Sequence, residues 1–255
     1  MPDETCKIEV NNHNKHIARL KKNDGFFEAG YGKRTLINSL IGFNDISDYE
    51  YEHKKIIRIS SIKESPDILS DLSTKKVKRS KALWYKVIKD TPFVSATLPI
   101  YLANNKNGVI DQKDLLEIIV DQMECGVGLI TIHPTANKEI YEEAKKRIVP
   151  ITSRGGGIVI KDLVAKEFKD ENVYLRILPQ IISYARKYEV VLSIGTTFRS
   201  ANIFDSNDKA QRMEIEKQIS LAKLISQNNV GVIIESPGHA RPNDIKRISS
   251  ILKTE

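Results

Sequence analysis

The residues best suited to chemistry come directly after apolar runs in this chain of 255 residues. His133 ends the run Leu-Ile-Thr-Ile-His, and Arg199 ends a Thr-Thr-Phe-Arg segment that follows the apolar residues 190–195. Glu235 begins the sequence Glu-Ser-Pro-Gly-His, which ends at His239. An imidazole can bind a ligand or a metal, and a guanidinium group pairs well with phosphate. These positions therefore predict a small-molecule site.

The sequence Ser153-Arg154-Gly155-Gly156-Gly157 adds a signal for anion binding. Glycines let backbone N–H groups approach an anion closely, and a helix that follows adds its positive N-terminus. The Arg154 side chain supplies a bidentate donor suited to phosphate. A plain strand-to-helix turn with an exposed arginine would give the same pattern, so both interpretations stay open on the sequence alone.

His239 is a candidate ligand for a divalent metal such as zinc or iron, because a neutral imidazole is a common metal ligand. One histidine is an incomplete site, since catalytic zinc normally has three protein ligands. The alternative is that His239 is a loop histidine and Glu235 a surface carboxylate. His133 has an alternative of its own, as a buried histidine whose hydrogen bonds are satisfied within the core.

The hydrophobic periodicity supplies elements that would position these residues, because short β-branched runs alternate with longer segments of helical period. The expected strands are 67–71, 93–100, 128–133, 148–152, 190–195 and 231–234. The expected helices include 75–89, 112–125, 173–188, 208–228 and 242–252. Six such units predict an α/β fold with a parallel sheet, either open and doubly wound or a (β/α)8 barrel. Both bind ligands at the C-terminal ends of the strands, where the candidate residues lie.

The N-terminal part of the chain lacks this regularity. We expect residues 1–64 to form an irregular extension and residues 65–255 to form the α/β domain. Cys125 falls at the end of an expected helix and is interpreted as a small core residue.

Composition narrows the classes of partner. Lys and Arg exceed Asp and Glu by 40 to 33, a net charge of +7, but the lysines are scattered, and the densest run, 75–81, is typical of an exposed helix face. Without interleaved aromatic residues, we expect no nucleic-acid partner. No apolar stretch reaches the ~20 residues of a membrane span, and the N-terminus carries no secretory signal. With two cysteines, the chain has no disulfide scaffold and is expected in the cytoplasm.

Several segments together resemble the phosphomethylpyrimidine synthase (ThiC) family. They are Leu-Pro-Ile-Tyr at 98–101, Ile-Thr-Ile-His at 130–133, Ser-Arg-Gly-Gly at 153–156, Asn-Asp-Lys-Ala-Gln at 207–211 and Glu-Ser-Pro-Gly-His at 235–239. Asp-Leu-Ser-Thr at 71–74 also fits the family. The order and spacing agree from about residue 35 to the end of the sequence.

The resemblance implies a (β/α) barrel of the TIM type, here incomplete with about six strand–helix units. It implies an enzyme of the non-standard radical S-adenosylmethionine class that converts 5-aminoimidazole ribonucleotide to the hydroxymethylpyrimidine phosphate of thiamine. Close paralogues make hydroxybenzimidazole from the same nucleotide. The implied cofactors are S-adenosylmethionine, a [4Fe–4S] cluster and a second, histidine-bound metal.

The resemblance also implies roles for individual residues. His239 corresponds to the first of two metal-binding histidines of the family. The residues that correspond to its substrate contacts are Tyr101, His133, Ser153, Arg154, Gly155, Arg199 and Glu235.

The sequence departs from the family at several positions, and the loss of one carboxylate and one amide removes hydrogen bonds that a ribonucleotide would need. Thr196 stands for an aspartate, Ser70 for a methionine and Leu40 for an asparagine. A site built for a polar group discriminates strongly when that group changes, so a different substrate is compatible with these departures. The family pattern continues with two strands, a second histidine and a CxxCxxxxC arm that this sequence does not contain, and Cys6 and Cys125 cannot replace that arm.

Three hypotheses follow. The first is a lyase-type ThiC-like enzyme that acts on a phosphorylated small molecule and needs a second chain or a second copy to complete the barrel and supply the cluster, because an unclosed barrel leaves unpaired strand edges. The second is a non-catalytic ligand-binding protein that keeps the anion site. The third is a cluster-independent metal lyase that uses Glu235 and His239.

Overall fold

A parallel sheet forms the centre of the molecule. The computed structural model describes residues 17–103, 105–235 and 238–254. Its main sheet has six parallel strands in the order β10-β9-β8-β5-β4-β3. These strands are β3 (Asn38–Ile41), β4 (Ile68–Asp71), β5 (Val94–Thr97), β8 (Leu129–Ile132), β9 (Val191–Ile194) and β10 (Val232–Ile234).

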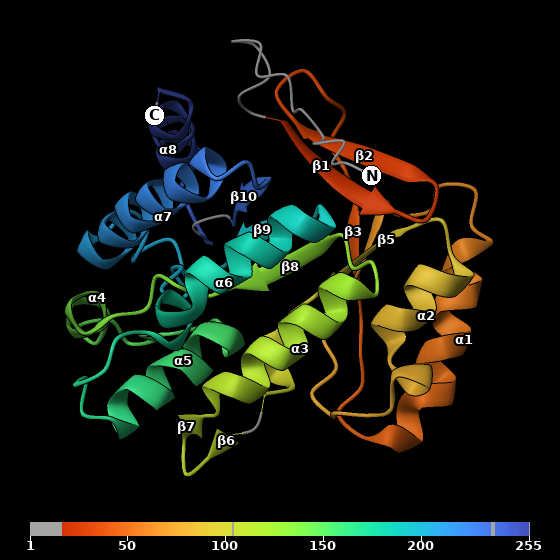
Figure 1. Cartoon of the computed structure of the whole chain (residues 1–255). Helices are drawn as coiled ribbons and strands as arrows, with labels where there is room; N and C mark the ends of the chain where they lie inside the picture. The colour runs from red at the N-terminus through yellow and green to blue at the C-terminus, as the bar shows by residue number, and fades with distance from the viewer. Residues whose placement is uncertain (1–16, 104, 236–237, 255) are drawn as a thin grey trace.

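Helices follow the strands along the chain. The four central strands are buried along their whole length, which is why they are continuous apolar or small-residue runs in the sequence. In Figure 1, α1 and α2 lie beside one edge of the sheet and α7 and α8 beside the other. The helices are α1 (Tyr49–Ser60), α2 (Leu83–Asp90), α3 (Gln112–Glu124), α4 (Lys138–Ala144), α5 (Arg154–Ala165), α6 (Val173–Tyr188), α7 (Lys209–Gln227) and α8 (Pro242–Thr254). Three short 3-10 helices are η1 (Ile46–Asp48), η2 (Arg79–Lys81) and η3 (Pro99–Tyr101).

An antiparallel hairpin, β1 (Ile17–Lys22) with β2 (Gly25–Gly30), packs across the N-terminal ends of the strands. Leu20 of this hairpin is fully buried in a cluster with Val94 and Val191. A Cβ at Gly128 would lie 2.2 Å from the Lys21 carbonyl oxygen, so the hairpin can pack this closely against residue 128 only because it is a glycine. A second small hairpin pairs β6 (Asn105–Lys106) with β7 (Val109–Ile110).

The long helices agree closely with their predicted bounds because their ends carry strong local signals. Asp111 caps α3 by accepting hydrogen bonds from the backbone N–H groups of Lys113 and Asp114, and Gly126 follows the helix with φ +100°. Asp208 caps α7 in the same way. Cys125 is partly buried against the main core, as expected for a small core residue.

Three predicted elements are wrong. Residues 148–152 form no strand; Ile148 is 97% exposed, and β8 pairs directly with β9. The sixth strand is β3 instead, which lies in the region expected to be irregular, as do β1, β2 and α1. Residues 75–78 are not helical either, because Lys76 and Arg79 reach across to form ion pairs with α3 rather than line a helix face.

The fold class is confirmed as mixed α/β with a parallel sheet flanked by helices. A closed barrel is not observed: within the described residues, β3 and β10 each pair with a main-sheet strand on one side alone. No helix in this part of the chain is both long and apolar enough to span a membrane.

Candidate functional site

A cavity of about 600 Å³ runs along one face of the sheet. We call it the trough. Alternate strand residues line it, as expected for one face of a pleated sheet, and the hairpin and the segment after it line its other side. The lining strand residues include Ile68, Ser70, Leu129, Thr131, Ser193 and Ile233.

The trough brings together most of the predicted site residues. Those that line it are Tyr101, His133, Ser153, Arg154, Arg199 and Glu235. They belong to the segments that follow β5, β8, β9 and β10 and to the start of α5, so they meet at the C-terminal ends of the strands. Gly155 packs directly behind them, and His239 lies in an adjoining open space that it shares with Arg199 and Glu235.

His133 is held from several sides. Its side chain is 2% exposed, and the Asn172 side-chain amide at the start of α6 donates a hydrogen bond of 3.0 Å to its carbonyl oxygen. Its Nε2 lies 3.2 Å from the Ser153 hydroxyl oxygen, which also accepts from the Gly156 N–H at 3.1 Å. Burial, and secondly the charge of Arg199, lower the pKa of the imidazole to about 4. His133 is therefore neutral near pH 7 and suited to hydrogen bonding.

The glycines after Ser153 have a structural role that the sequence analysis missed. The α5 helix begins at Arg154, so these glycines form its first turn rather than a loop. A Cβ at Gly155 would lie 2.4 Å from His133 Cε1, and one at Gly195 would lie 2.7 Å from His133 Nε2. The imidazole is thus enclosed between two glycine backbones. The N-terminus of α5 still points its positive end at this region, which favours an anion.

Arg154 and Arg199 give the trough free positive charge. Among the described residues, neither guanidinium group has a carboxylate within 4.0 Å, whereas Lys33 pairs with Glu28 at 2.6 Å and Arg34 pairs with Asp67. Arg154 lies 5.2 Å from the centre of the Tyr101 ring. Burial raises the pKa of the Tyr101 hydroxyl, while the nearby arginines oppose that rise. Unpaired guanidinium groups beside a helix N-terminus suit a phosphate group.

Thr196, which replaces an aspartate of the family pattern, supports Glu235. Its N–H donates to Glu235 Oε2 at 3.1 Å, and its hydroxyl donates to the Glu235 carbonyl oxygen at 3.2 Å. Thr196 is 1% exposed. It therefore positions the carboxylate and is too enclosed to contact a ligand widely.

Glu214 on α7 was not among the residues predicted from the sequence. Its carboxyl group holds the segment that carries Arg199. Glu214 is fully buried and accepts from the Thr135 hydroxyl at 2.6 Å and from the N–H groups of Thr197 and Phe198 at 2.7 and 2.8 Å. Burial raises its pKa to about 7, against the effect of these hydrogen bonds. The sequence did hold a signal, because polar residues 211, 214 and 218 recur at helical spacing on the buried face of α7.

The donor set does not suit an iron–sulfur cluster. Cys125 precedes β8 and His133 follows it, so the thiol lies at the opposite end of the sheet from the site. Cys6 is outside the described residues. His239 Nδ1 lies 3.1 Å from the Ser200 carbonyl oxygen, and nowhere in residues 17–103, 105–235 and 238–254 do three His, Cys, Asp or Glu side chains come together as a metal site. The predicted metal at His239 stays a prediction, with Glu235 as the neighbouring donor.

Comparison with known proteins gives the family. Residues 8–254 match the radical SAM ThiC family. The chain belongs to this family. Membership implies S-adenosylmethionine and an iron–sulfur cluster for the family chemistry. A phosphomethylpyrimidine synthase from Carboxydothermus hydrogenoformans is 28% identical over 237 residues, which cover 88% of this chain and 53% of that protein. The chain therefore spans about half the length of this relative.

Solved structures give weaker similarities. A dihydropteroate synthase from Thermus thermophilus has 12% identity and a TM-score of 0.31, over 92% of this chain and 98% of that one. The Xanthomonas albilineans dihydropteroate synthase has 10% identity and a TM-score of 0.29 over the same shares. Similarity of this size establishes no common architecture.

Proposed function

We propose that this chain is the substrate-binding part of a phosphomethylpyrimidine synthase-like lyase of thiamine pyrimidine biosynthesis, or of related benzimidazole biosynthesis. Its substrate is a phosphorylated molecule similar to aminoimidazole ribonucleotide, bound in the trough. The observation that carries the proposal is that Arg154 and Arg199 lie beside the N-terminus of α5 with no carboxylate of the described residues within 4.0 Å, in the same cavity as Glu235 and the neutral imidazole of His133.

Each side chain has a role that its surroundings support. Arg154 and the first N–H groups of α5 bind the phosphate, and Arg199 adds a second positive charge. The hydroxyl of Tyr101 and the carboxylate of Glu235 hydrogen-bond the heterocycle and the sugar. The imidazole of His133, whose Nδ1 is sealed and whose Nε2 faces the Ser153 hydroxyl, positions the start of α5. Gly155 and Gly195 fix the imidazole plane, so these groups are ordered before the ligand arrives.

The radical step needs a cluster, and this chain's thiols do not suit one, so we propose that a second polypeptide supplies it. The free sides of β3 and β10 are the surfaces on which such a chain would add strands. Ile37, just before β3, is 59% exposed and does not line the trough, as expected for an apolar residue that a partner covers. A second copy of this chain would use the same edges but would bring no further cluster ligands.

A non-catalytic binding protein is the second candidate function. Leu40 lines the trough where the family pattern has an amide, and Ser70 lines it where the pattern has a methionine. These changes leave the proposed phosphate site at Arg154 unaltered and change the end of the trough that Leu40 and Ser70 line. A protein that retains binding but has lost turnover would show this distribution of changes.

Thermal unfolding with aminoimidazole ribonucleotide or inorganic phosphate tests the binding proposal. A ligand at ~100 times its dissociation constant stabilises the protein by about 2.7 kcal/mol, which is readily measured as a rise in Tm. Arg154→Ala should abolish the rise, and Arg186→Ala, at an exposed position of α6, is the matched control that should keep it. Absence of a rise in the unaltered chain with both ligands would contradict the proposal.

Anaerobic reconstitution with iron and sulfide distinguishes the two candidate functions. The chain alone should show no cluster absorbance. Co-expression with a chain that carries a CxxCxxxxC arm should give cluster absorbance and product from the ribonucleotide if the enzyme proposal is right. Binding without product in that complex would favour the non-catalytic protein.

A further inference from the structure

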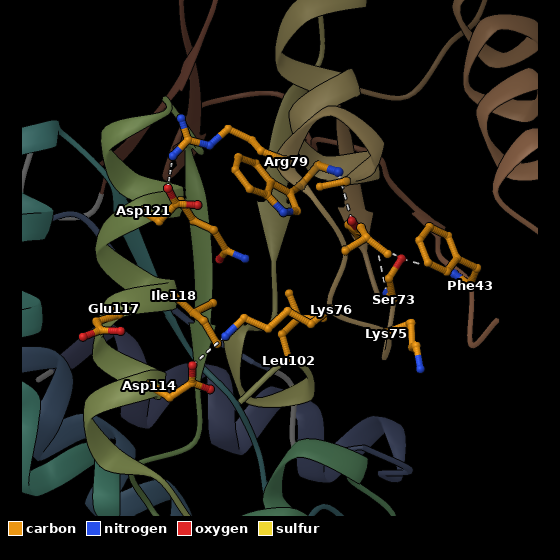
Figure 2. Close-up of a pocket in the computed structure, with 15 residues that line it drawn as sticks. Phe43, Ser73, Lys75, Lys76, Arg79, Leu102, Asp114, Glu117, Ile118 and Asp121 are labelled. Carbon is orange, nitrogen blue, oxygen red and sulfur yellow. Dashed lines mark hydrogen bonds and ion pairs between the residues drawn. The ribbon is translucent and has the colours of Figure 1, made fainter. Parts of the chain in front are cut away.

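A second cavity lies on the opposite face of the sheet, between α3 and the segment 72–84 that leads into α2. We call it the α3 cavity. Its volume is about 240 Å³, and it shares no lining residue with the trough. Figure 2 shows Asp114, Ile118 and Asp121 of α3 on one side of a common space and Ser73, Lys75 and Lys76 on the other.

Most of the wall is apolar. The indole of Trp84 is 5% exposed and forms part of this wall. The other apolar lining residues are Phe43, Val77, Ala82, Leu102 and Ile118. Such a wall suits an apolar or aromatic body.

Two hydrogen-bond donors on the wall, on side chains that are mostly buried, have no acceptor among the residues that the structure describes. The Thr97 hydroxyl donates to Gln122 Oε1 at 2.7 Å, which leaves the Gln122 amide nitrogen as the free end of a side chain that is 1% exposed. Neither this nitrogen nor Trp84 Nε1 forms a hydrogen bond within the part of the chain that the structure describes.

These two N–H groups are not sealed inside the protein. Among the described side chains, the sealed polar atoms without a partner are His133 Nδ1, Tyr174 Oη and Arg176 Nε, and neither donor is among them. Each therefore reaches open space, and the space that Trp84 and Gln122 share is the α3 cavity. A ligand that brings an acceptor into this space therefore gains only the net effect of one hydrogen bond over water, about fivefold in affinity.

The charges at the mouth are balanced. Lys76 pairs with Asp114 at 2.5 Å, and Arg79 pairs with Asp121, so these four side chains neutralise one another across the opening. One further charge of each sign, Lys75 and Glu117, completes the rim, and the buried carboxyl group of Asp71 on the wall already accepts hydrogen bonds from the Ser73 hydroxyl and the Trp84 backbone N–H. Such a rim gives no preference to an ion of either sign, in contrast to the trough.

We propose that the α3 cavity is a second small-molecule site, specific for a neutral, single-ring nitrogen heterocycle whose acceptor atom binds the N–H group of Gln122, with Trp84 beside it as a second donor. The volume is below the ~300–1,000 Å³ of pockets for drug-sized ligands, which limits the ligand to about one ring. This site does not depend on the function proposed for the trough.

Trp84 is the single tryptophan of the chain, so its fluorescence reports on this cavity directly. Pyridine and benzene are matched probes of the same size, and pyridine alone carries an acceptor. We expect saturable changes in Trp84 emission with both, and at least about fivefold tighter binding of pyridine, the effect of one hydrogen bond. No saturable change with either probe, or equal affinity for the two, would overturn the proposal.

Substitutions place the binding within the cavity. Gln122→Glu keeps the oxygen that Thr97 needs but removes the N–H donors, and should weaken pyridine about tenfold or more. Gln112→Glu makes the same change on the same helix outside the cavity and should leave the affinity unchanged. Ile118→Phe fills the cavity and should abolish binding of both probes. Circular dichroism confirms folding, and pyridine affinity that survives both Gln122→Glu and Ile118→Phe in folded protein would contradict the assignment.

Discussion

The trough and the α3 cavity lie on opposite faces of one sheet and treat charge in opposite ways. In the trough, Arg154 and Arg199 have no carboxylate partner among the described residues, while the α3 cavity has Lys76 and Arg79 in ion pairs across its mouth. An unpaired charge favours an oppositely charged ligand. Where the charges are paired, as at the mouth of the α3 cavity, the neutral N–H donors inside the cavity decide which ligand binds. We therefore expect the pairing of the basic residues, rather than their number, to decide which class of ligand each cavity binds.

Removing both free guanidinium groups is the strongest way to break this comparison. Each charged hydrogen bond to phosphate contributes about 1.5–3 kcal/mol, so Arg154→Ala with Arg199→Ala should weaken phosphate-containing ligands by more than ~100-fold. Pyridine binding in the α3 cavity should not change. Isothermal titration measures the first affinity and Trp84 fluorescence the second. Equal losses at both sites would show a general loss of structure instead.

A second prediction concerns pH, because two buried groups beside the trough titrate in opposite senses. The folded pKa of Glu214 is raised to about 7, so its contribution to stability is complete below the unfolded pKa of 4.5 and is lost as pH rises through about 7. The folded pKa of His133 is lowered to about 4, so its contribution is complete above 6.5 and is lost as pH falls through about 4. Between about pH 4.5 and 6.5 the two effects offset each other.

Single substitutions should reveal each half of that balance. In Glu214→Gln, His133 alone titrates in this window, so the stability of the variant should rise with pH. In His133→Gln, Glu214 alone titrates, so the stability of the variant should fall with pH. The pKa shift of each group corresponds to a change on the order of 3 kcal/mol in the free energy of unfolding across the window. Urea unfolding at a series of pH values measures the slopes, which are interpreted relative to each variant's own stability. Parallel profiles for the two variants would contradict the opposite assignments.

The third prediction separates two glycines of the same helix. Gly155→Ala places a Cβ 2.4 Å from the His133 ring and should destabilise the fold by about 1–3 kcal/mol, and weaken ligands in the trough. Gly157→Ala meets its nearest atom at 3.8 Å and should stabilise the fold by up to about 1 kcal/mol, because alanine favours the helix. Chemical denaturation compares them. Equal effects would mean that the imidazole moves aside at little cost.

The sequence could predict some parts of the molecule but not others, depending on whether local signals determine them. The helices α3 and α6 combine strong periodicity with capping residues, so local signals fix their bounds. The convergence of His133, Arg154 and Glu235 also followed, because residues after parallel strands meet at one edge. Local signals failed at β3, a four-residue strand on a sheet edge, and at 148–152, an apolar run that lies on the surface.

Tertiary contacts determine what the sequence could not show. The positions of residues 75–81 depend on partners on α3 that are distant in the sequence, such as Asp121 for Arg79. The role of Gly155 depends on the imidazole of His133 from another unit of the fold. The pairing of charges, on which the difference between the two cavities rests, is likewise visible only in three dimensions.

The smallest expected effect concerns the part of the trough where apolar Leu40 replaces an amide of the family pattern. Leu40 is 56% exposed and lines the trough, so Leu40→Asn should change stability by less than about 0.5 kcal/mol. If the ligand is a ribonucleotide, the restored amide adds one neutral hydrogen bond and should raise its affinity about fivefold, with inorganic phosphate unaffected. Leu40→Ala is the control that removes the same apolar side chain without adding a donor. A gain with Leu40→Ala equal to that with Leu40→Asn would mean that relief of crowding, rather than hydrogen bonding, sets the preference at this end.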